Sequence, residues 1–276
     1  MYKRQGYVYV AIVMVFIGIY FMAYNLFQGY PYFSYTLANT IVIFTIATPI
    51  LTMKSMAEER KSKTDQMLLT YPVSVTGIVM GKFLALMTVF AVPLLISCIC
   101  PIIIEIVGDG YFFVDYISIF AFICMGCVFV SIGMFISSLT ESQIIAAVAS
   151  FGILLVLYLW PSLLSYLPTS AIGNAGVIIL VIALISVVLY NISKNIFIPI
   201  VMNAVSIIGV GLWYFIGGES LAGVLAETFS NFSCTEIYYN FAMYNSFDVG
   251  GILFFASLTA FFIFLTIQSV QKRRWS

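Results

Sequence analysis

Charge and histidine are what this sequence has least of. Only 8% of its 276 residues are charged and none is histidine, whereas 63% are hydrophobic and the mean hydropathy is +1.12. A soluble domain carries about 25% charged residues, so this chain has too few to cover a surface that faces water. Its apolar residues are therefore expected to face lipid. Without histidine, the usual zinc sites and Ser–His pairs of enzymes are excluded.

The sequence also lacks the motifs of a redox enzyme, a nucleotide-binding protein or a nucleic-acid-binding protein. Cys124 and Cys127 form a CxxC, but they lie inside an apolar run, where small residues are typical of contacts between helices. Around Gly81 and Lys82, a phosphate-binding loop would need glycine at Thr76 and Ser or Thr at Phe83. No basic run is long enough for nucleic acid. We expect no metal, no cofactor bound by the chain itself, and no enzyme activity of its own.

Long apolar runs are what the chain does contain. A helix needs about 20 apolar residues to cross the hydrocarbon core of a bilayer. The first run, Tyr7 to Phe27, is too long for a signal peptide and is expected to remain as a span. About eight spans are predicted in one transmembrane domain over residues 1–276: about 7–28, 36–57, 77–103, 116–138, 143–165, 173–190, 197–217 and 250–270. The fold class is an all-α integral membrane protein.

The distribution of charge orients these spans. With both termini in the cytoplasm and eight spans, all eleven Lys and Arg residues fall on the cytoplasmic side. Seven acidic residues fall outside, without a basic residue among them: Glu105, Asp109, Asp115, Glu219, Glu227, Glu236 and Asp248. A six-span arrangement without the sixth and seventh spans would place Lys194 outside. No ionisable residue lies in the middle of a predicted span, which argues against transport coupled to protons or sodium.

One long external segment is predicted at 218–249. Its apolar residues recur at helical spacing from Leu221 to Phe232, which favours a helix lying in the outer membrane interface. The tyrosines and phenylalanine that follow, Tyr238, Tyr239, Phe241 and Tyr244, fit an interfacial aromatic belt. A simple packed loop is the alternative.

The cytoplasmic segment 58–76 is the most informative connection. Thr64 can cap a short helix, Asp65 lies in its first turn, and Leu68 and Leu69 give it an apolar patch. The residue before Pro72 avoids the helical region, so this helix ends there, and Ser74 or Thr76 can cap the next span. The charges alone are also typical of a solvated turn, but an apolar patch facing the cytoplasm indicates a docking partner.

These residues resemble a known family. The strings Pro49-Ile-Leu-Thr-Met53, Ala57-Glu-Glu-Arg60, KTDQMLLT from Lys63 to Thr70, and Gly81-Lys82-Phe83 are similar to those of ABC-2 permeases of ATP-binding-cassette transporters. The gliding-motility-type and copper-processing-type branches are the most similar. Residues 133–143 and the C-terminal stretch 258–275 add to the resemblance, which covers most of the chain.

The resemblance implies a permease with a type V exporter-like fold, driven by a separate ATPase subunit that carries ATP and Mg. Two permease copies or paralogues would pair in the cell membrane of a bacterium, surrounded by lipid. The implied coupling helix comprises Thr64, Asp65, Gln66, Met67, Leu68, Leu69, Tyr71, Pro72, Val73 and Ser74. Glu58, Glu59 and Arg60 would lie at the base of the second span, and Thr140 and Glu141 would form a second cytoplasmic contact.

Three functions remain open at the level of sequence. The leading hypothesis is the membrane subunit of an exporter. The second is a non-transporting subunit that transmits ATPase motion to external partners, and the third is a secondary transporter. The chain departs from the resembling family in two places: only five residues precede Gly6, where an interfacial helix is usual, and the pair of spans over 173–217 is additional.

Overall fold

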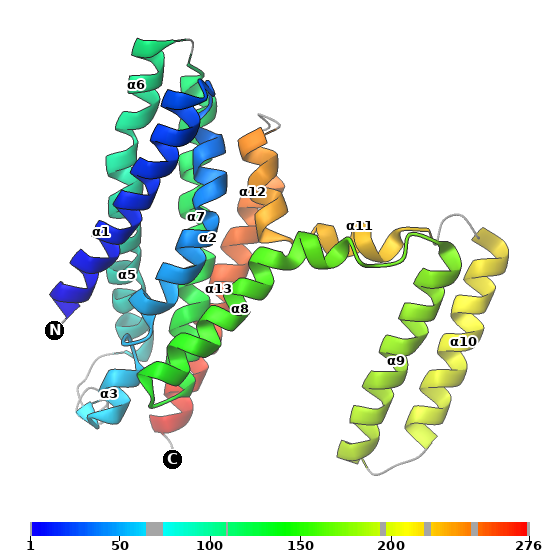
Figure 1. The fold of residues 1–276 in the computed structure, drawn as a ribbon. Helices are drawn as coiled ribbons and strands as arrows, with labels where there is room; N and C mark the ends of the chain where they lie inside the picture. Colours follow the sequence, from blue (N-terminus) through cyan, green and yellow to red (C-terminus); the bar gives the residue numbers. More distant parts are fainter. Residues whose placement is uncertain are drawn as a thin grey trace. The chain divides into compact units, whose positions relative to one another are not determined.

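The structure is a computed structural model that describes residues 2–64, 74–108, 110–193, 197–217, 222–243 and 248–274. Within these ranges every regular element is a helix (Figure 1). In chain order they are α1 (Tyr2–Tyr20), the π-helix η1 (Phe21–Phe27), α2 (Phe33–Thr52), α3 (Ala57–Lys61), α5 (Val75–Ser97), α6 (Ile99–Val107), α7 (Phe112–Leu139), α8 (Gln143–Leu164), α9 (Ala171–Ser193), α10 (Phe197–Gly217), α11 (Val224–Ser230), α12 (Cys234–Met243) and α13 (Val249–Arg274).

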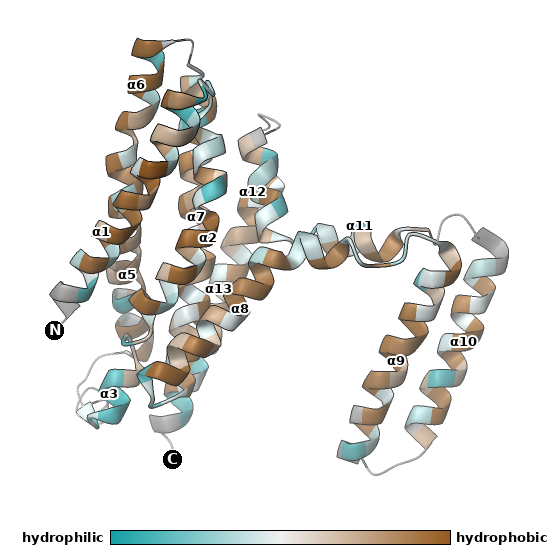
Figure 2. Cartoon of the chain, viewed as in Figure 1, coloured by the Kyte–Doolittle hydropathy of each residue, from teal (hydrophilic) through white to brown (hydrophobic). Residues whose placement is uncertain are grey.

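The expected all-α membrane fold is confirmed. Seven helical stretches among the described residues are long and apolar enough to cross a bilayer. The eighth expected span, 197–217, is helix α10, whose apolar part Pro199–Tyr214 is shorter than the others. Figure 2 shows apolar residues along α1, α5, α6, α7 and α9, whereas α3 is hydrophilic.

The chain divides into two compact units. Unit 1 comprises Met1–Tyr158 and Cys234–Ser276, and unit 2 comprises Leu159–Ser233. Unit 1 holds the segment expected to couple to a partner and also α12, which returns to it after unit 2.

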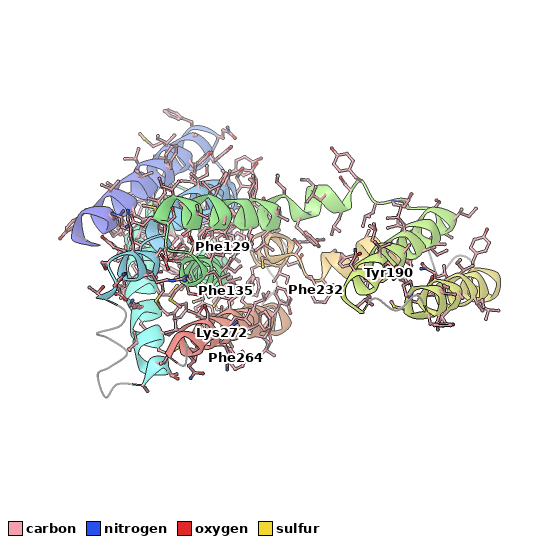
Figure 3. The ribbon with its side chains drawn as sticks, turned by 90° about the horizontal axis from the view of Figure 1, so that it is seen from below. Phe129, Phe135, Tyr190, Phe232, Phe264 and Lys272 are labelled. Carbon is pink, nitrogen blue, oxygen red and sulfur yellow. The ribbon has the colours of Figure 1, made fainter. Side chains whose placement is uncertain are left out.

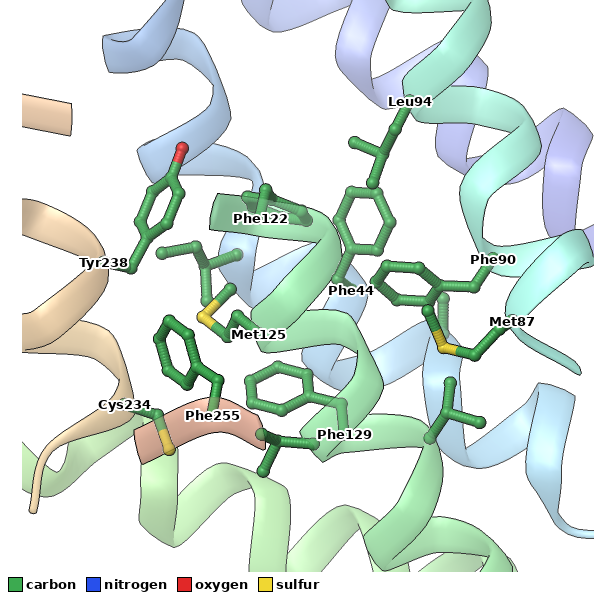
Figure 4. Packing of buried hydrophobic residues seen from close by; sticks show 14 of the residues in the cluster. Phe44, Met87, Phe90, Leu94, Phe122, Met125, Phe129, Cys234, Tyr238 and Phe255 are labelled. Carbon is green, nitrogen blue, oxygen red and sulfur yellow. The ribbon is translucent and has the colours of Figure 1, made fainter. Parts of the chain in front are cut away.

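Helix α7 is the centre of unit 1, packing against α2, α5, α12 and α13. Phe44 of α2 lies between Phe90 of α5 and Phe122 of α7, with ring centroids 5.1 and 4.7 Å apart, and all three side chains are fully buried (Figure 4). Such aromatic pairs add to the packing energy beyond the area they bury. Van der Waals packing of this kind has to hold helices together in lipid, where the hydrophobic effect does not drive their association.

Two glycines let neighbouring helices approach α7. A Cβ on Gly133 would lie 2.2 Å from Oγ1 of Thr52, and one on Gly126 would lie 2.1 Å from the ring of Phe90. The hydroxyl groups of Thr40, Thr45 and Thr52 in α2 are compatible with this dry interior because they donate to carbonyls of their own helix. Thr45, for example, bonds the carbonyl of Ile41 at 2.9 Å. Small and polar residues at these contacts follow the rules of membrane helix packing.

Helix α7 begins at Phe112, four residues before the expected span, and this changes the place of Asp115. We expected Asp115 in an external loop, but it lies in the first turn of α7 and is only 1% exposed. Its Oδ1 accepts the backbone N–H of Ser34 at 3.1 Å, in the first turn of α2. Helix N-termini attract negative charge, so the burial of this carboxylate has a local compensation that a single sequence does not reveal.

The expected aromatic belt is wrong for two of its residues. Tyr238 and Phe241 of α12 are buried rather than at an interface, and Tyr238 packs edge-on against Phe122 with ring centroids 5.3 Å apart. Figure 4 shows Tyr238 pointing toward α7. Aromatic residues suit both an interface and a core, so composition alone did not separate the two. In the described part of 218–249, helical structure occurs as α11 and α12.

Unit 2 is built around the hairpin of α9 and α10. Asn203 of α10 donates to the hydroxyl of Ser186 on α9 at 2.8 Å. At the start of the unit, the indole N–H of Trp160 donates to the carbonyl of Phe229 in α11 at 3.0 Å. Most large side chains of the hairpin are exposed, including Tyr190 (Figure 3), as expected of helices that face lipid.

Candidate functional site

The candidate site is the connection between α2 and α5, which comprises α3 and the start of α5 and is called the corner below. It contains the described part of the expected coupling segment, residues 58–64 and 74–76. Helix α3 follows α2 directly, and Lys63 adopts a left-handed φ of 56° just after it, a common way to end a helix. The Thr64 hydroxyl lies 2.9 Å from that of Ser62. Asp65, Gln66, Met67, Leu68, Leu69, Tyr71, Pro72 and Val73 lie outside the described residues.

Ser74 is the N-cap of α5, as its position predicts. Its side chain accepts the N–H of Gly77 at 3.2 Å, and its backbone is extended. This is the geometry of a serine cap, which satisfies one of the N–H groups left open at a helix start. The expected coupling segment is therefore anchored by helical structure at both of its described ends, α3 and α5.

Ser137, near the end of α7, fixes the start of α3. Its Oγ accepts the N–H groups of Met56 and Ala57 at 3.2 and 3.1 Å, and it donates to the carbonyl of Met53 at 3.1 Å. The residue before α3, Met56, has no capping side chain of its own. A hydroxyl on α7 thus supplies the cap that the local sequence does not.

Arg60 joins α3 to the end of α7 at a second point. Its Nη1 donates to the carbonyl of Ser138 at 2.7 Å, and its Nη2 lies 4.0 Å from Oε1 of Glu141. The Arg60 side chain is 12% exposed and that of Glu141 is 71% exposed. The bond to Ser138 therefore carries most of the attachment, because an ion pair with an exposed carboxylate contributes little.

A third attachment ties α3 to α5. Lys82 forms an ion pair with Glu59, and its Nζ also donates to the carbonyl of Ser55 at 2.9 Å and contacts Sδ of Met56 at 3.4 Å. Both charged side chains are mostly buried. The ammonium group has three donors and three acceptors here, which satisfies a charge held near apolar surface.

A cavity of about 280 Å³ lies beside this ion pair. Its lining comes from α1, α2, α3 and α5: Gln5, Gly6, Leu51, Ser55, Glu59, Lys82, Ala85, Leu86 and Val89. The cavity gives α3 and α5 free space on one side, whereas α7 holds α3 closely on the other. The cavity therefore separates α3 from α1, whereas the hydrogen bonds of Ser137 and Arg60 join α3 to α7.

The structure brings some predicted site residues together and adds others. Arg60 and Glu141, expected in two separate cytoplasmic contacts, approach each other. Thr140 instead accepts the N–H of Ser142 at 3.1 Å, closing the turn between α7 and α8. Sequence reasoning missed Lys82 as a partner of Glu59 and Ser137 as a cap. Their contacts join residues 23 and about 80 positions apart, and no local pattern marks them.

This corner consists of hydrogen bonds and ion pairs that join α3 to α7 and α5. The parts of the chain that the structure describes hold no group of three His, Cys, Asp or Glu side chains able to bind a metal ion. What the corner contains is a short polar helix fixed to α7 and α5. A push on α3 therefore reaches the helix at the centre of the core.

Comparison with known proteins identifies the family. The family described as ABC-2 family transporter protein matches residues 11–172, more than half of the chain. No curated protein and no solved structure matches. The matched range includes α2, α3, α5 and α7, which build the corner described above. The family comprises membrane components of transporters that normally work with an ATPase subunit. This multi-pass membrane protein belongs to the ABC-2 family of transporter proteins.

Proposed function

We propose that this chain is the permease subunit of an ABC-2 exporter in the cell membrane of a bacterium, with both termini in the cytoplasm. A separate ATPase subunit binds the cytoplasmic segment 58–76 and hydrolyses ATP with Mg, and a second permease copy or paralogue completes the pathway. The short charged helix α3, bonded to α7 through Ser137 and Arg60, is the observation that carries this proposal.

The proposed sequence of motion follows from these contacts. Closure of the ATPase moves the segment after α3, which includes the apolar residues Leu68 and Leu69. The shift passes through Arg60 to the end of α7 and through Glu59 and Lys82 to α5. Because α7 packs against α2, α5, α12 and α13 and also contacts α3 and α6, its displacement reaches the whole bundle. Thr140 and Glu141 form the second contact with the ATPase.

The resemblance to the gliding-motility-type and copper-processing-type branches bears on the alternative function. The resembling family includes systems that serve motility and cofactor maturation, which motivates a subunit that transmits motion to external partners rather than moves a substrate. The corner would transmit ATPase motion in both functions. The two functions differ in whether a substrate crosses the membrane.

Reconstitution in vesicles distinguishes the exporter from a subunit that transmits motion to external partners. The chain and its co-purifying ATPase are placed in inside-out vesicles with a set of amphipathic fluorescent dyes. Uptake that requires ATP and both subunits supports the exporter. ATP turnover that responds to the permease, without any dye uptake, favours transmission of motion to external partners. Uptake by this chain alone, driven by a pH or sodium gradient, contradicts both.

A further inference from the structure

A second cavity lies beside η1, the end of α6 and the start of α7. In Figure 1 these parts of unit 1 are at the end opposite α3. The cavity measures about 440 Å³ and is lined by the π-helix η1, the turn Gly29–Pro31, the end of α6 and Tyr111. We propose that this cavity binds a quaternary ammonium group, held between the ring faces of Tyr30 and Tyr111.

The wall formed by η1 and its turn is held in place by one buried side chain. The amide of Asn25 donates to the carbonyls of Tyr30 and Tyr32 at 2.8 and 3.1 Å, and its Oδ1 accepts the hydroxyl of Thr36 at 2.6 Å. Gly29 turns the chain with a φ of 70°. π-Helical turns are rare and are frequently found at functional sites, and here the turn orders the residues that line a cavity.

Tyr30 and Tyr111 each stack on a second tyrosine. Tyr30 stacks on Tyr35 with ring centroids 4.7 Å apart and planes 5° apart, and Tyr111 stacks on Tyr32 at 4.6 Å and 12°. One face of each ring is thus covered by another tyrosine, and Tyr30 and Tyr111, which both line the cavity, remain 42% and 49% exposed. The face of an aromatic ring carries negative potential and attracts cations.

Charge in the surrounding segments has a single sign. Residues 5–53 and 83–193 contain no Lys or Arg, whereas Glu105 and Asp115 fall close to the lining in sequence. Acidic groups without basic neighbours produce a negative potential, which concentrates cations and repels anions.

The hydrogen-bonding groups explain why the cation should be quaternary. Among the lining residues, Asn25 donates both of its N–H groups to backbone carbonyls, and its Oδ1 accepts the hydroxyl of Thr36. A sugar or a primary amine needs free partners for several hydrogen bonds. A quaternary ammonium group donates none, so ring faces and negative potential suffice for it.

The test compares choline with its neutral isostere 3,3-dimethylbutan-1-ol, by calorimetry on the full chain in nanodiscs of phosphatidylglycerol. Choline is expected to bind, and the isostere at least tenfold more weakly, because both have the same shape and only one has a charge. Tyr30→Leu and Tyr111→Leu should each weaken choline binding by about fivefold. Tyr111→Phe, which keeps the ring, should bind choline as the original protein does.

Tyr166→Leu is the matched control, because Tyr166 is 86% exposed and lies in the other unit. Repeating the titration in phosphatidylcholine nanodiscs identifies the source of the ligand: weaker choline binding there means that the lipid headgroup occupies the cavity, and unchanged binding means a free cation. The proposal is overturned if choline does not bind, if the isostere binds equally well, or if the leucine variants bind choline normally while unfolding at the original temperature.

Discussion

Ser137 forms hydrogen bonds with three backbone groups at the connection between α2 and α3. It accepts from Met56 and Ala57 and donates to Met53, so one hydroxyl on α7 closes the connection between α2 and α3. The next residue, Ser138, is also buried, but its hydroxyl bonds the carbonyl of Phe135 in its own helix at 2.6 Å. Both serines are buried, but the hydroxyl of Ser137 bonds backbone groups of the α2–α3 connection and that of Ser138 bonds its own helix.

We predict that Ser137→Ala lowers the free energy of unfolding by about 1 kcal/mol, the usual effect of losing a helix cap. Ser138→Ala should cost less, because no N–H group of another element loses its acceptor. The measurement is the unfolding of both variants in the same detergent. Equal losses would show that Ser137 does not act as a cap.

Gly133 permits the close approach of α2 and α7. In Gly133→Ala the new Cβ would lie 2.2 Å from Oγ1 of Thr52, which is buried. We expect a destabilisation of about 1–3 kcal/mol, as for other overpacked cores. Gly152→Ala on α8 is the control, since its Cβ would meet nothing within 4 Å. Thermal unfolding of the two variants separates steric overlap from the general effect of replacing a helical glycine.

Helix α3 is too short to be stable alone, since isolated helices shorter than about 12 residues are marginal in water. Its stability has to come from Arg60, the Glu59–Lys82 pair and Ser137. A helix held by side chains of two neighbours moves when either neighbour moves, which is the property that coupling requires.

Replacement of Arg60 tests this dependence. Arg60→Met removes a charged hydrogen bond to the carbonyl of Ser138, worth about 1.5–3 kcal/mol. Amide hydrogen exchange over α3 should then be at least tenfold faster, measured by mass spectrometry on the intact protein. Lys61→Met changes an exposed neighbour in the same helix and should leave exchange unchanged. Similar exchange in both variants would mean that Arg60 does not hold α3.

The elements show what a single sequence predicts and what it does not. Apolar runs and the polar break at Ser137–Gln143 were sufficient to place α7 and α8 as separate helices. The burial of Asp115 depends on the N-terminus of α2, 81 residues away, and the burial of Tyr238 depends on Phe122. Contacts between distant residues leave no periodic pattern in the sequence, so both were assigned to external surfaces.

At the scale of the whole molecule, the segregation of charge remains the strongest sequence feature. The eleven basic residues all fall at one side of the predicted topology. Helix α3, which contains Arg60 and Lys61 and is followed by Lys63, is hydrophilic in Figure 2. In the helices of unit 1, apolar side chains face outward as well as inward. Phe264 of α13, for example, is 55% exposed and Phe129 of α7 is buried (Figure 3). The proposed function requires that these lipid-facing helices move together when the ATPase acts on the cytoplasmic end.

The most direct test of this account is the ATP turnover of the partner ATPase in nanodiscs with the permease. Replacing Leu68 and Leu69 by aspartate should abolish both co-purification of the ATPase and the response of its turnover to the permease, because charge disrupts an apolar contact. The double valine replacement at the same positions keeps an apolar surface and should retain both. Association and turnover that are unchanged in the aspartate variant would contradict coupling through this segment.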